Sequence, residues 1–183
     1  MSSTTRFRAL AALFAFTTGA LFIAGGPAQA APSAQTHSRS SEVCWSAPGS
    51  TAVQCFTDDA AFADAVFEQT GTVLVVEGSG FALRLQVGVL ATYVLARLYE
   101  DTSYGGTAFV VSSSSSATCT TGSGLQANLP AAWIDRISSF RSYFSCATRL
   151  AENFAQGGNL YGYFVNAASV GVLNDEASSY RVQ

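Results

Sequence analysis

The last third of the sequence contains one short pattern twice. The stretch "WIDRISSFRSY" places Asp135 three residues before a serine pair, and "LNDEASSYRVQ" repeats this spacing from Asp175. An aromatic residue and then an arginine follow each serine pair. One copy could be a chance turn, but two copies with the same spacing predict one supersecondary unit that is used twice.

The first thirty residues have the composition of a secretory signal peptide. Arg6 and Arg8 form a basic start, "ALAALFAFTTGALFIAGG" is apolar, and Ala28–Ala30 supplies a small-x-small cleavage pattern. The apolar run is close to spanning length, so the alternative is an uncleaved membrane anchor. Polar residues inside the run favour cleavage. We therefore expect a signal peptide at 1–30, a flexible leader at 31–41, and a secreted, extracellular protein with no membrane segment after cleavage.

Charge and residue types argue against two classes of function. The sequence has nine basic residues, all Arg, against twelve acidic ones, and removal of Arg6 and Arg8 leaves seven against twelve, a net charge of −5. Because there is no basic stripe, we expect no nucleic-acid partner. The one histidine, His37, lies in the leader, so Ser-His and Cys-His nucleophile pairs are missing, as are phosphate-binding glycine loops. The sequence predicts that the protein is not an enzyme.

Four cysteines in a secreted chain predict two disulfides. Cys44 and Cys55 flank a Pro-Gly turn between two short β-like runs, so we expect them to join a hairpin. That leaves Cys119 to pair with Cys146. A zinc site is the alternative, but the cysteines lack C-x-x-C spacing and the histidine lies in the leader.

Residues 42–91 predict a small α+β segment that contains the disulfide hairpin, one helix and short strands. The stretch "TDDAAFADAVFEQTG" predicts the helix, with Thr57 or Asp58 as its N-cap and Gly71 at its C-terminal end. "TVLVV" and "FALRLQV" predict short strands on either side of a Gly-rich turn. The apolar face of the helix would contain Phe62, Val66 and Phe67.

Residues 92–183 have the short β-runs and regular turn signals of a β-sandwich. The low-complexity stretch "SSSSSATCTTGSGLQ" is predicted to be a loop. Within "LYEDTSYGG", Tyr99 and Tyr104 can stack across a folded hairpin, and Gly106 permits a backbone conformation that a side chain would obstruct. We expect the sandwich core to include Trp133, Phe140, Tyr143 or Phe144, Phe164 and Tyr180.

The hairpin and the repeated pattern together resemble the βγ-crystallin family. "LYEDTSYGG" resembles the opening of a Greek key of that family. "DRISS" and "NDEASS" resemble its Asn/Asp-Asn/Asp-x-x-Ser/Thr-Ser signature, which precedes the fourth strand of each key. The resemblance covers residues 92–183 and implies an all-β sandwich of two Greek keys. The sequence departs from the family at Ala151 and Gln156, which replace the second key's aromatics, and at Ile134, which replaces the first Asn/Asp.

In this family the signature commonly builds a calcium site. The resemblance implies a carbonyl from the third signature position, a hydroxyl from the fifth, side-chain oxygen from the Asn/Asp pair, and a carbonyl from the opposite key's first hairpin. The corresponding residues are Asp135, Arg136, Ser138, Asn174, Asp175, Glu176, Ser178, Glu100 and Glu152. Mostly neutral oxygens imply weak affinity, about 10⁻⁵ to 10⁻³ M. Because Ile134 removes an oxygen from the first copy, we expect the site that uses Ser178 to be tighter. The alternative is that Asp135 and Asp175 only cap turns.

The sequence leaves more than one function open. A calcium-binding extracellular domain is one, and the fold is also similar to secreted bacterial metalloproteinase inhibitors and to killer-toxin-like proteins. A secreted protease is then an expected partner, and the loop around Cys119 is the candidate reactive segment, since a preorganised loop loses little entropy on docking. Its serines equally suit a solvated linker.

Overall fold

The computed structural model describes residues 42–78, 90–120 and 124–183. The predicted signal peptide, the leader and the predicted strand "FALRLQV" lie outside these ranges. All the described residues belong to one compact unit. Among the residues described, no helix has the length and apolar character that a membrane span requires.

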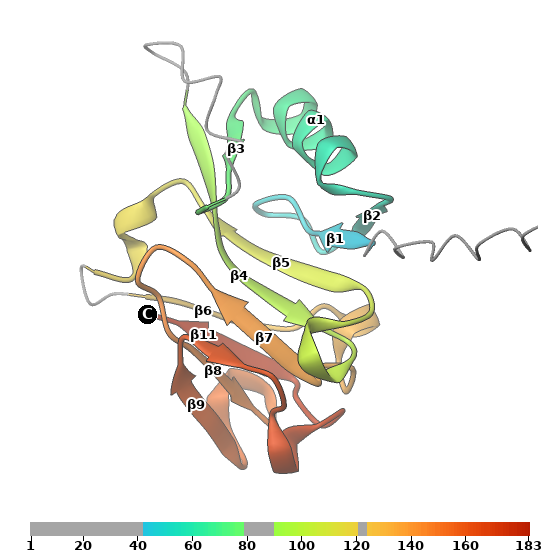
Figure 1. The fold of residues 1–183 in the computed structure, drawn as a ribbon, viewed down its shortest axis with the longest axis vertical. Helices are drawn as coiled ribbons and strands as arrows, with labels where there is room; N and C mark the ends of the chain where they lie inside the picture. The colour runs from blue at the N-terminus through green and yellow to red at the C-terminus, as the bar shows by residue number, and fades with distance from the viewer. Residues whose placement is uncertain (1–41, 79–89, 121–123) are drawn as a thin grey trace, which may run out of the picture. The chain divides into compact units, whose positions relative to one another are not determined.

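Two β-sheets form the described part of the protein (Figure 1). The larger sheet contains β1 (Val43–Trp45), β2 (Gln54–Phe56), β3 (Val73–Val75), β4 (Ala91–Tyr99), β5 (Ala108–Ser113), β7 (Ser139–Ser142) and β10 (Asn166–Ala167). Its order is β10-β7-β4-β5-β1-β2, and β3 pairs with β4. The smaller sheet contains β6 (Leu125–Asn128), β8 (Thr148–Ala151), β9 (Leu160–Phe164) and β11 (Ser179–Val182) in the order β6-β11-β8-β9.

The strands from β4 to β11 form two Greek keys that exchange one strand each. The first key is β4, β5, β6 and β7, and the second is β8, β9, β10 and β11. β6 leaves its own key to pair with β11, and β10 leaves its own key to pair with β7. The predicted sandwich of two Greek keys is therefore confirmed. Each sheet of the sandwich is completed by a strand from the other key.

The low-complexity stretch is only partly a loop. Its first two serines end β5, a short 3-10 turn, η3 (Ser116–Thr118), follows, and its last two residues, Leu125 and Gln126, begin β6. The prediction failed at Leu125 because β6 has a short and weakly apolar sequence. Its alternation of apolar and polar residues covers only four positions, and its partner β11 lies in the other key, far along the sequence.

The sandwich core lies between the two sheets and contains most of the predicted aromatics. Trp133, Phe140 and Tyr180 are buried there. Phe144 is half-buried against the same core, whereas Tyr143 packs against the second core on the other face of the larger sheet. The prediction for Phe164 is wrong, since its side chain is 48% exposed. β9, which contains Phe164, is the edge strand of the smaller sheet, so fewer neighbours are available to cover it.

The α-helix α1 (Asp59–Thr70) covers the other face of the larger sheet (Figure 1). Asp58 is its N-cap, since Asp58 Oδ1 accepts hydrogen bonds from the backbone N–H groups of residues 60 and 61 at 3.0 and 2.9 Å. Gly71 ends it with φ 67°. Phe62 and Val66 are fully buried, but Phe67 is 56% exposed, which corrects the predicted apolar face.

The three strands within residues 42–78 are part of the larger sheet, together with three strands of the first key. β1 pairs in parallel with β5, and β3 pairs in parallel with β4. Arg97 on β4 also forms an ion pair with Asp59 of α1, with Nη2 and Oδ1 2.7 Å apart. Because the larger sheet is covered on both faces, β4 and β5 are almost continuously buried instead of alternating.

Both predicted disulfides are confirmed. Cys44 and Cys55 face each other across β1 and β2 with Cα atoms 4.0 Å apart. Cys119 and Cys146, with Cα atoms 5.2 Å apart, join the β5–β6 connection to the segment between the two keys. All four cysteines of the chain are thus paired.

Candidate metal centre

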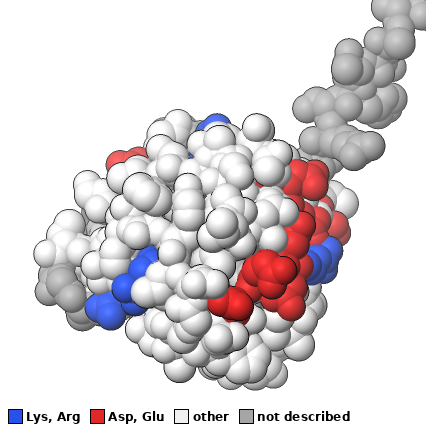
Figure 2. All heavy atoms as spheres, turned by 90° about the horizontal axis from the view of Figure 1, so that it is seen from below, with Lys and Arg blue, Asp and Glu red and all other residues white. Residues whose placement is uncertain are grey.

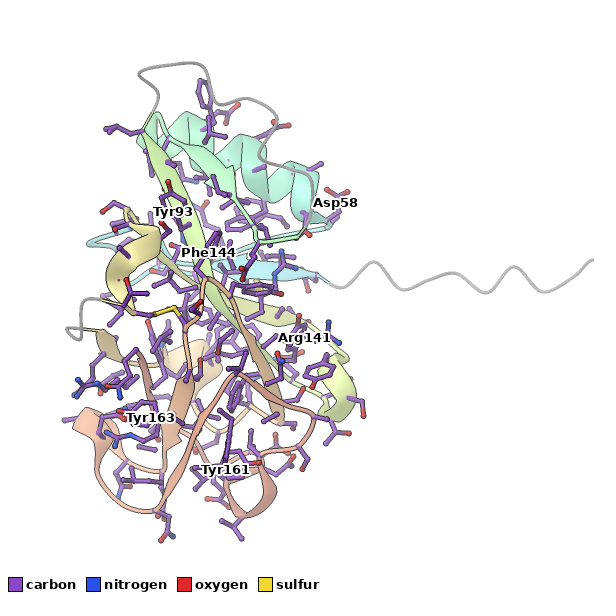
Figure 3. The ribbon with its side chains drawn as sticks, turned by 60° about the vertical axis from the view of Figure 1, so that its left-hand side comes forward. Asp58, Tyr93, Arg141, Phe144, Tyr161 and Tyr163 are labelled. Atoms are coloured by element: carbon purple, nitrogen blue, oxygen red, sulfur yellow. A yellow bond between two sulfur atoms is a disulfide. The ribbon has the colours of Figure 1, made fainter. Side chains whose placement is uncertain are left out.

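The first hairpin, between β4 and β5, has the folded shape that its motif predicts. The rings of Tyr99 and Tyr104 meet edge to face with centroids 5.9 Å apart. Arg141, which Figure 3 labels, lies over the Tyr104 ring at 3.9 Å. Gly106 has φ 72°, and a Cβ there would lie 2.9 Å from the Asp101 carboxylate. Both the left-handed backbone and the lack of room for a Cβ therefore require glycine at this position, as predicted.

The second hairpin, between β8 and β9, keeps this shape although its aromatics are missing. Ala155 and Gln156 have φ values of 53° and 65°, close to 57° and 65° at Ser103 and Tyr104 in the first hairpin. Gly158, with φ 73°, corresponds to the glycine of the first hairpin. The aromatic pair is therefore not what fixes the backbone.

The second serine of each signature holds the backbone of the folded hairpin in place. Ser139 Oγ donates to the Asp101 carbonyl at 2.6 Å and accepts from the Tyr104 N–H at 3.0 Å. Ser179 Oγ makes the equivalent bonds to the Asn153 carbonyl at 2.6 Å and from the Gln156 N–H at 3.1 Å. The sequence-based reasoning assigned no role to these two serines, although their repetition in both copies was the available signal.

The two signatures are joined to each other at their aspartates. Each aspartate follows a short 3-10 turn, η4 (Ala131–Trp133) or η6 (Gly171–Leu173), and has φ 56°. Aspartate is among the few residues that tolerate this left-handed conformation. The Asp135 N–H donates to the Ala177 carbonyl at 3.0 Å, and the Asp175 N–H donates to the Ile137 carbonyl at 3.2 Å. These reciprocal bonds bring each aspartate to the other key's signature.

Because each aspartate lies against the other key's signature, two groups of residues with oxygen atoms form where the signatures meet. In the first, Ser138 Oγ donates to Asp175 Oδ1 at 3.1 Å. The Ser138 N–H bonds to the Tyr99 carbonyl at 2.9 Å, and the strand register places the next residue, Glu100, opposite Ser138. The first oxygen group is Glu100, Arg136, Ser138 and Asp175. By the repeat, the second oxygen group is Asp135, Glu152, Glu176 and Ser178, where the Ser178 N–H bonds to the Ala151 carbonyl at 2.9 Å.

Which of these oxygens would coordinate one ion stays a prediction, but the structure shows which residues approach each other. Asp175 contacts Ser138 of the first signature, so the two keys meet at this pair. The hairpin residue beside Ser138 is Glu100 of the same key. The physical reason is that each signature pairs with the first hairpin of its own key through β7 or β11, so only the left-handed aspartates reach across.

Asn174 and Ile134, the two residues compared from sequence, do not occupy matching ligand positions. Asn174 Nδ2 donates to Asp175 Oδ2 at 2.7 Å, so Asn174 orients the neighbouring carboxylate. Ile134 packs against the sandwich core. The replacement of an Asn/Asp by Ile134 therefore removes an orienting contact near Asp135 and adds apolar packing.

The charges around the groups are mixed. Among the described residues there is no cluster of three or more His, Cys, Asp or Glu side chains that could hold a metal. Arg136 forms an ion pair with Glu100, and its Nη1 donates to the Ala132 carbonyl at 2.8 Å. Acidic side chains still gather in one patch on the face shown in Figure 2. A cation bound here would depend on hydroxyl and carbonyl oxygens as much as on carboxylates.

The types of oxygen atom in these groups are those that calcium binds. Calcium takes six to eight oxygen ligands, which include carboxylates, hydroxyls, backbone carbonyls and water. The first oxygen group supplies a carboxylate from one key and a hydroxyl from the other, with the two oxygen atoms 3.1 Å apart. Oxygens at that separation can belong to one coordination shell around an ion with ligand distances of about 2.3–2.6 Å.

The loop around Cys119, the candidate reactive segment, is held by several local bonds in its described part. Besides the disulfide, Ser113 Oγ and Thr118 Oγ1 lie 2.7 Å apart, and Ser115 Oγ accepts from the Ala117 N–H at 3.2 Å. Residues 121–123, in the middle of the predicted segment, lie outside the described residues.

No family model matches the chain, and a search of curated proteins finds no match. Solved structures do align with about half of it. A βγ-crystallin domain from Clostridium beijerinckii is 19% identical over 48% of this chain and 95% of its own, with a TM-score of 0.38. The N-terminal domain of Protein S is 18% identical over 49% and 94%, with a TM-score of 0.38. An archaeal βγ-crystallin is 21% identical over 48% and 95%, with a TM-score of 0.35.

The architecture follows from the chain's own topology. Two hairpins of the same backbone conformation are each held by a signature serine, and the two keys exchange β6 and β10. In strand order and in both repeated motifs, residues 91–182 form a βγ-crystallin-like sandwich of two Greek keys, with a small α+β segment joined to its larger sheet.

Proposed function

We propose that the protein is a secreted, extracellular binding module that takes calcium at its two oxygen groups and is not an enzyme. The observation that carries the proposal is the contact between Ser138 Oγ and Asp175 Oδ1, which brings oxygens from different keys to 3.1 Å. Two disulfides, which are typical of oxidising compartments, and the signal-peptide composition support secretion.

Calcium would act here as a clamp between the keys. In each oxygen group the hydroxyl comes from one signature and the aspartate from the other, so an ion that binds both resists separation of the keys. With few carboxylates in reach, we expect weak sites, with Kd of about 10⁻⁵ to 10⁻³ M. An ion that binds only the folded state at a hundredfold excess over Kd adds about 2.7 kcal/mol to the free energy of unfolding.

The test is a calcium titration of the purified mature protein by calorimetry, together with its melting temperature in chelator and in millimolar calcium. Asp175→Asn and Asp135→Asn form a matched pair, because asparagine tolerates the φ of 56° at both positions while it removes one carboxylate from one group. Each variant should lose one binding step, and the double variant should lose the calcium-dependent rise in melting temperature. A parent protein that neither binds calcium nor melts higher in its presence would refute the proposal.

Inhibition of a secreted metalloproteinase is the second candidate function. The disulfide and local hydrogen bonds around Cys119 favour it, because they preorganise the segment at little further entropic cost on docking. Inhibition of a thermolysin-like enzyme by the intact protein, lost when Cys119 and Cys146 are both replaced by serine, is the expected result. A killer-toxin-like activity would appear instead as growth inhibition without protease inhibition.

A further inference from the structure

Position 136 of the first signature and position 176 of the second are equivalent in the repeat but carry opposite charges. We propose that Arg136 is a built-in counter-ion of the first oxygen group and makes its calcium affinity the lower of the two. The inference rests on the proposed function and concerns how calcium is divided between the sites.

Three contacts hold the Arg136 guanidinium at the first group. Its Nη2 forms the ion pair with Glu100 Oε1, its Nη1 donates to the Ala132 carbonyl at 2.8 Å, and its Cζ lies 5.4 Å from the centre of the Trp133 ring. Glu100 Oε2 accepts the Thr107 N–H at 3.3 Å. Both oxygens of this carboxylate are therefore engaged within the protein.

The second group keeps the backbone bond of its hairpin glutamate but lacks the arginine and the tryptophan. Glu152 Oε2 accepts the Asn159 N–H at 2.9 Å, which matches the bond of Glu100. Glu176 stands where the arginine would be, and Leu173 stands where the first key has its tryptophan. Within the described residues, neither of the two ion pairs involves Glu152 or Glu176. The carboxylate of Glu152 is thus not neutralised by an arginine.

The formal charges differ in the same sense. Around the first group, three acids and one arginine sum to −2; these are Glu100, Asp101, Asp175 and Arg136. Around the second group, three acids sum to −3, since asparagine occupies the position that corresponds to Asp101; these are Asp135, Glu152 and Glu176. A divalent cation is attracted more strongly by the second set, and a unit charge within the Debye length of about 8 Å changes affinity by on the order of ten-fold.

The structure therefore assigns the tighter site to the group that contains Ser178. This is the order expected from sequence, but the cause is different. Sequence reasoning attributed it to the oxygen lost at Ile134, which packs in the core, whereas the geometry attributes it to the arginine at position 136.

The experiment measures each site alone. Asp135→Asn weakens the second group, so the remaining calcium binding reports the first group. Adding Arg136→Gln, which removes the charge but keeps an amide donor for the Ala132 carbonyl, should tighten this binding three- to thirty-fold. Adding Glu176→Arg to Asp175→Asn should loosen binding at the second group by a similar factor. Arg141→Gln is the control, because Arg141 stacks on a tyrosine of the same key instead of pairing with an acid of the group; it should change the affinity less than three-fold.

Salt separates a charge effect from a structural one. The gain from Arg136→Gln should shrink in 0.5 M salt, because screening reduces the arginine's effect on a bound cation. Binding that is present in all variants but insensitive to Arg136→Gln would overturn the inference and leave the proposed function standing. The inference would also be overturned if the higher-affinity calcium-binding step disappeared in Asp175→Asn and remained in Asp135→Asn. No binding in the parent or in any variant would overturn both.

Discussion

Ser139 and Ser179 show how one hydroxyl can hold a folded hairpin whose other side chains have changed. Each accepts one backbone N–H and donates to one backbone carbonyl within its hairpin, and each is fully buried. The second hairpin has lost both aromatics but keeps its left-handed backbone at Ala155 and Gln156. The serine therefore contributes more to this conformation than the rings do.

Replacing either serine by alanine should destabilise the protein by about 1–3 kcal/mol, because a buried backbone donor and acceptor lose their partner. Ser179→Ala should cost at least as much as Ser139→Ala, since the second hairpin has no ring pair to support it. Urea unfolding gives the comparison, with the exposed Ser114→Ala as the control that should change stability by less than about 0.5 kcal/mol. Equal stability of all three variants would contradict the role given to the hydroxyls.

Tyr180 gives a pH dependence whose sign follows from burial. Burial raises the pKa of Tyr180 from 10.0 to about 12. The folded state therefore keeps the phenol proton that the unfolded state releases above pH 10. The free energy of unfolding keeps its full value below pH 10 and falls as the pH rises toward 12. The loss attributable to Tyr180 is about 2–3 kcal/mol.

Unfolding followed between pH 9 and pH 12 checks this expectation. Tyr180→Phe should flatten part of the slope. The rest should come from Tyr99, because burial, together with the neighbouring Tyr143, raises the pKa of Tyr99 to about 12 as well. A slope that does not change in Tyr180→Phe would contradict the assignment.

At the scale of elements, α1 was predictable because its signals are local. Asp58 caps its start and Gly71 ends it, as its sequence indicates. Which of its apolar residues are buried was not predictable, because that depends on the angle at which the helix meets the sheet. The centroid of the Phe62 ring lies 5.7 Å from that of Trp45 and 5.6 Å from that of Phe56, while Phe67 is exposed to solvent.

The helix supplies its own matched pair of mutations. Phe62→Ala should cost about 3–5 kcal/mol, because it empties a fully buried site in the core under α1. Phe67→Ala, at a position 56% exposed, should cost less than about 0.5 kcal/mol. Chemical denaturation measures both, and a comparable loss in the two variants would mean that α1 is rotated relative to the sheet.

The short strands were harder to predict than the helix. β7 and β11 follow the repeated signature and were expected, but β6 and β10 have only four and two residues, which is too short for a sequence pattern to stand out. Their pairing partners lie in the other key, so nothing in the neighbouring sequence indicates them. The grouping of the candidate ligands was hidden for a similar reason. The sequence predicts the candidate residues one by one, but the positions of Asp135 and Asp175 beside the other key's signature are visible only in the structure.

For the molecule as a whole, the two disulfides and the shared sheet predict one cooperative unit. Replacing Cys119 and Cys146 by serine should lower the free energy of unfolding by about 3.5 kcal/mol, and replacing Cys44 and Cys55 by about 3 kcal/mol, from the entropy of the loops they close. Because β1 and β3 pair with strands of the first key, each variant should still unfold in a single transition.

Circular dichroism and tryptophan fluorescence should report the same midpoint for these variants, since Trp45 lies in the core under α1 and Trp133 lies in the sandwich core. Separate midpoints would show that residues 42–78 unfold independently of the two keys.

The exchange of β6 and β10 also has a consequence for the growing chain. Synthesis delivers the first key before the second, but the larger sheet lacks β10 until the second key is made, and β6 has no partner until β11 is made. The first key therefore cannot complete its pairing on its own. The nascent chain keeps open strand edges until β11 has emerged, and from that moment both keys can close together.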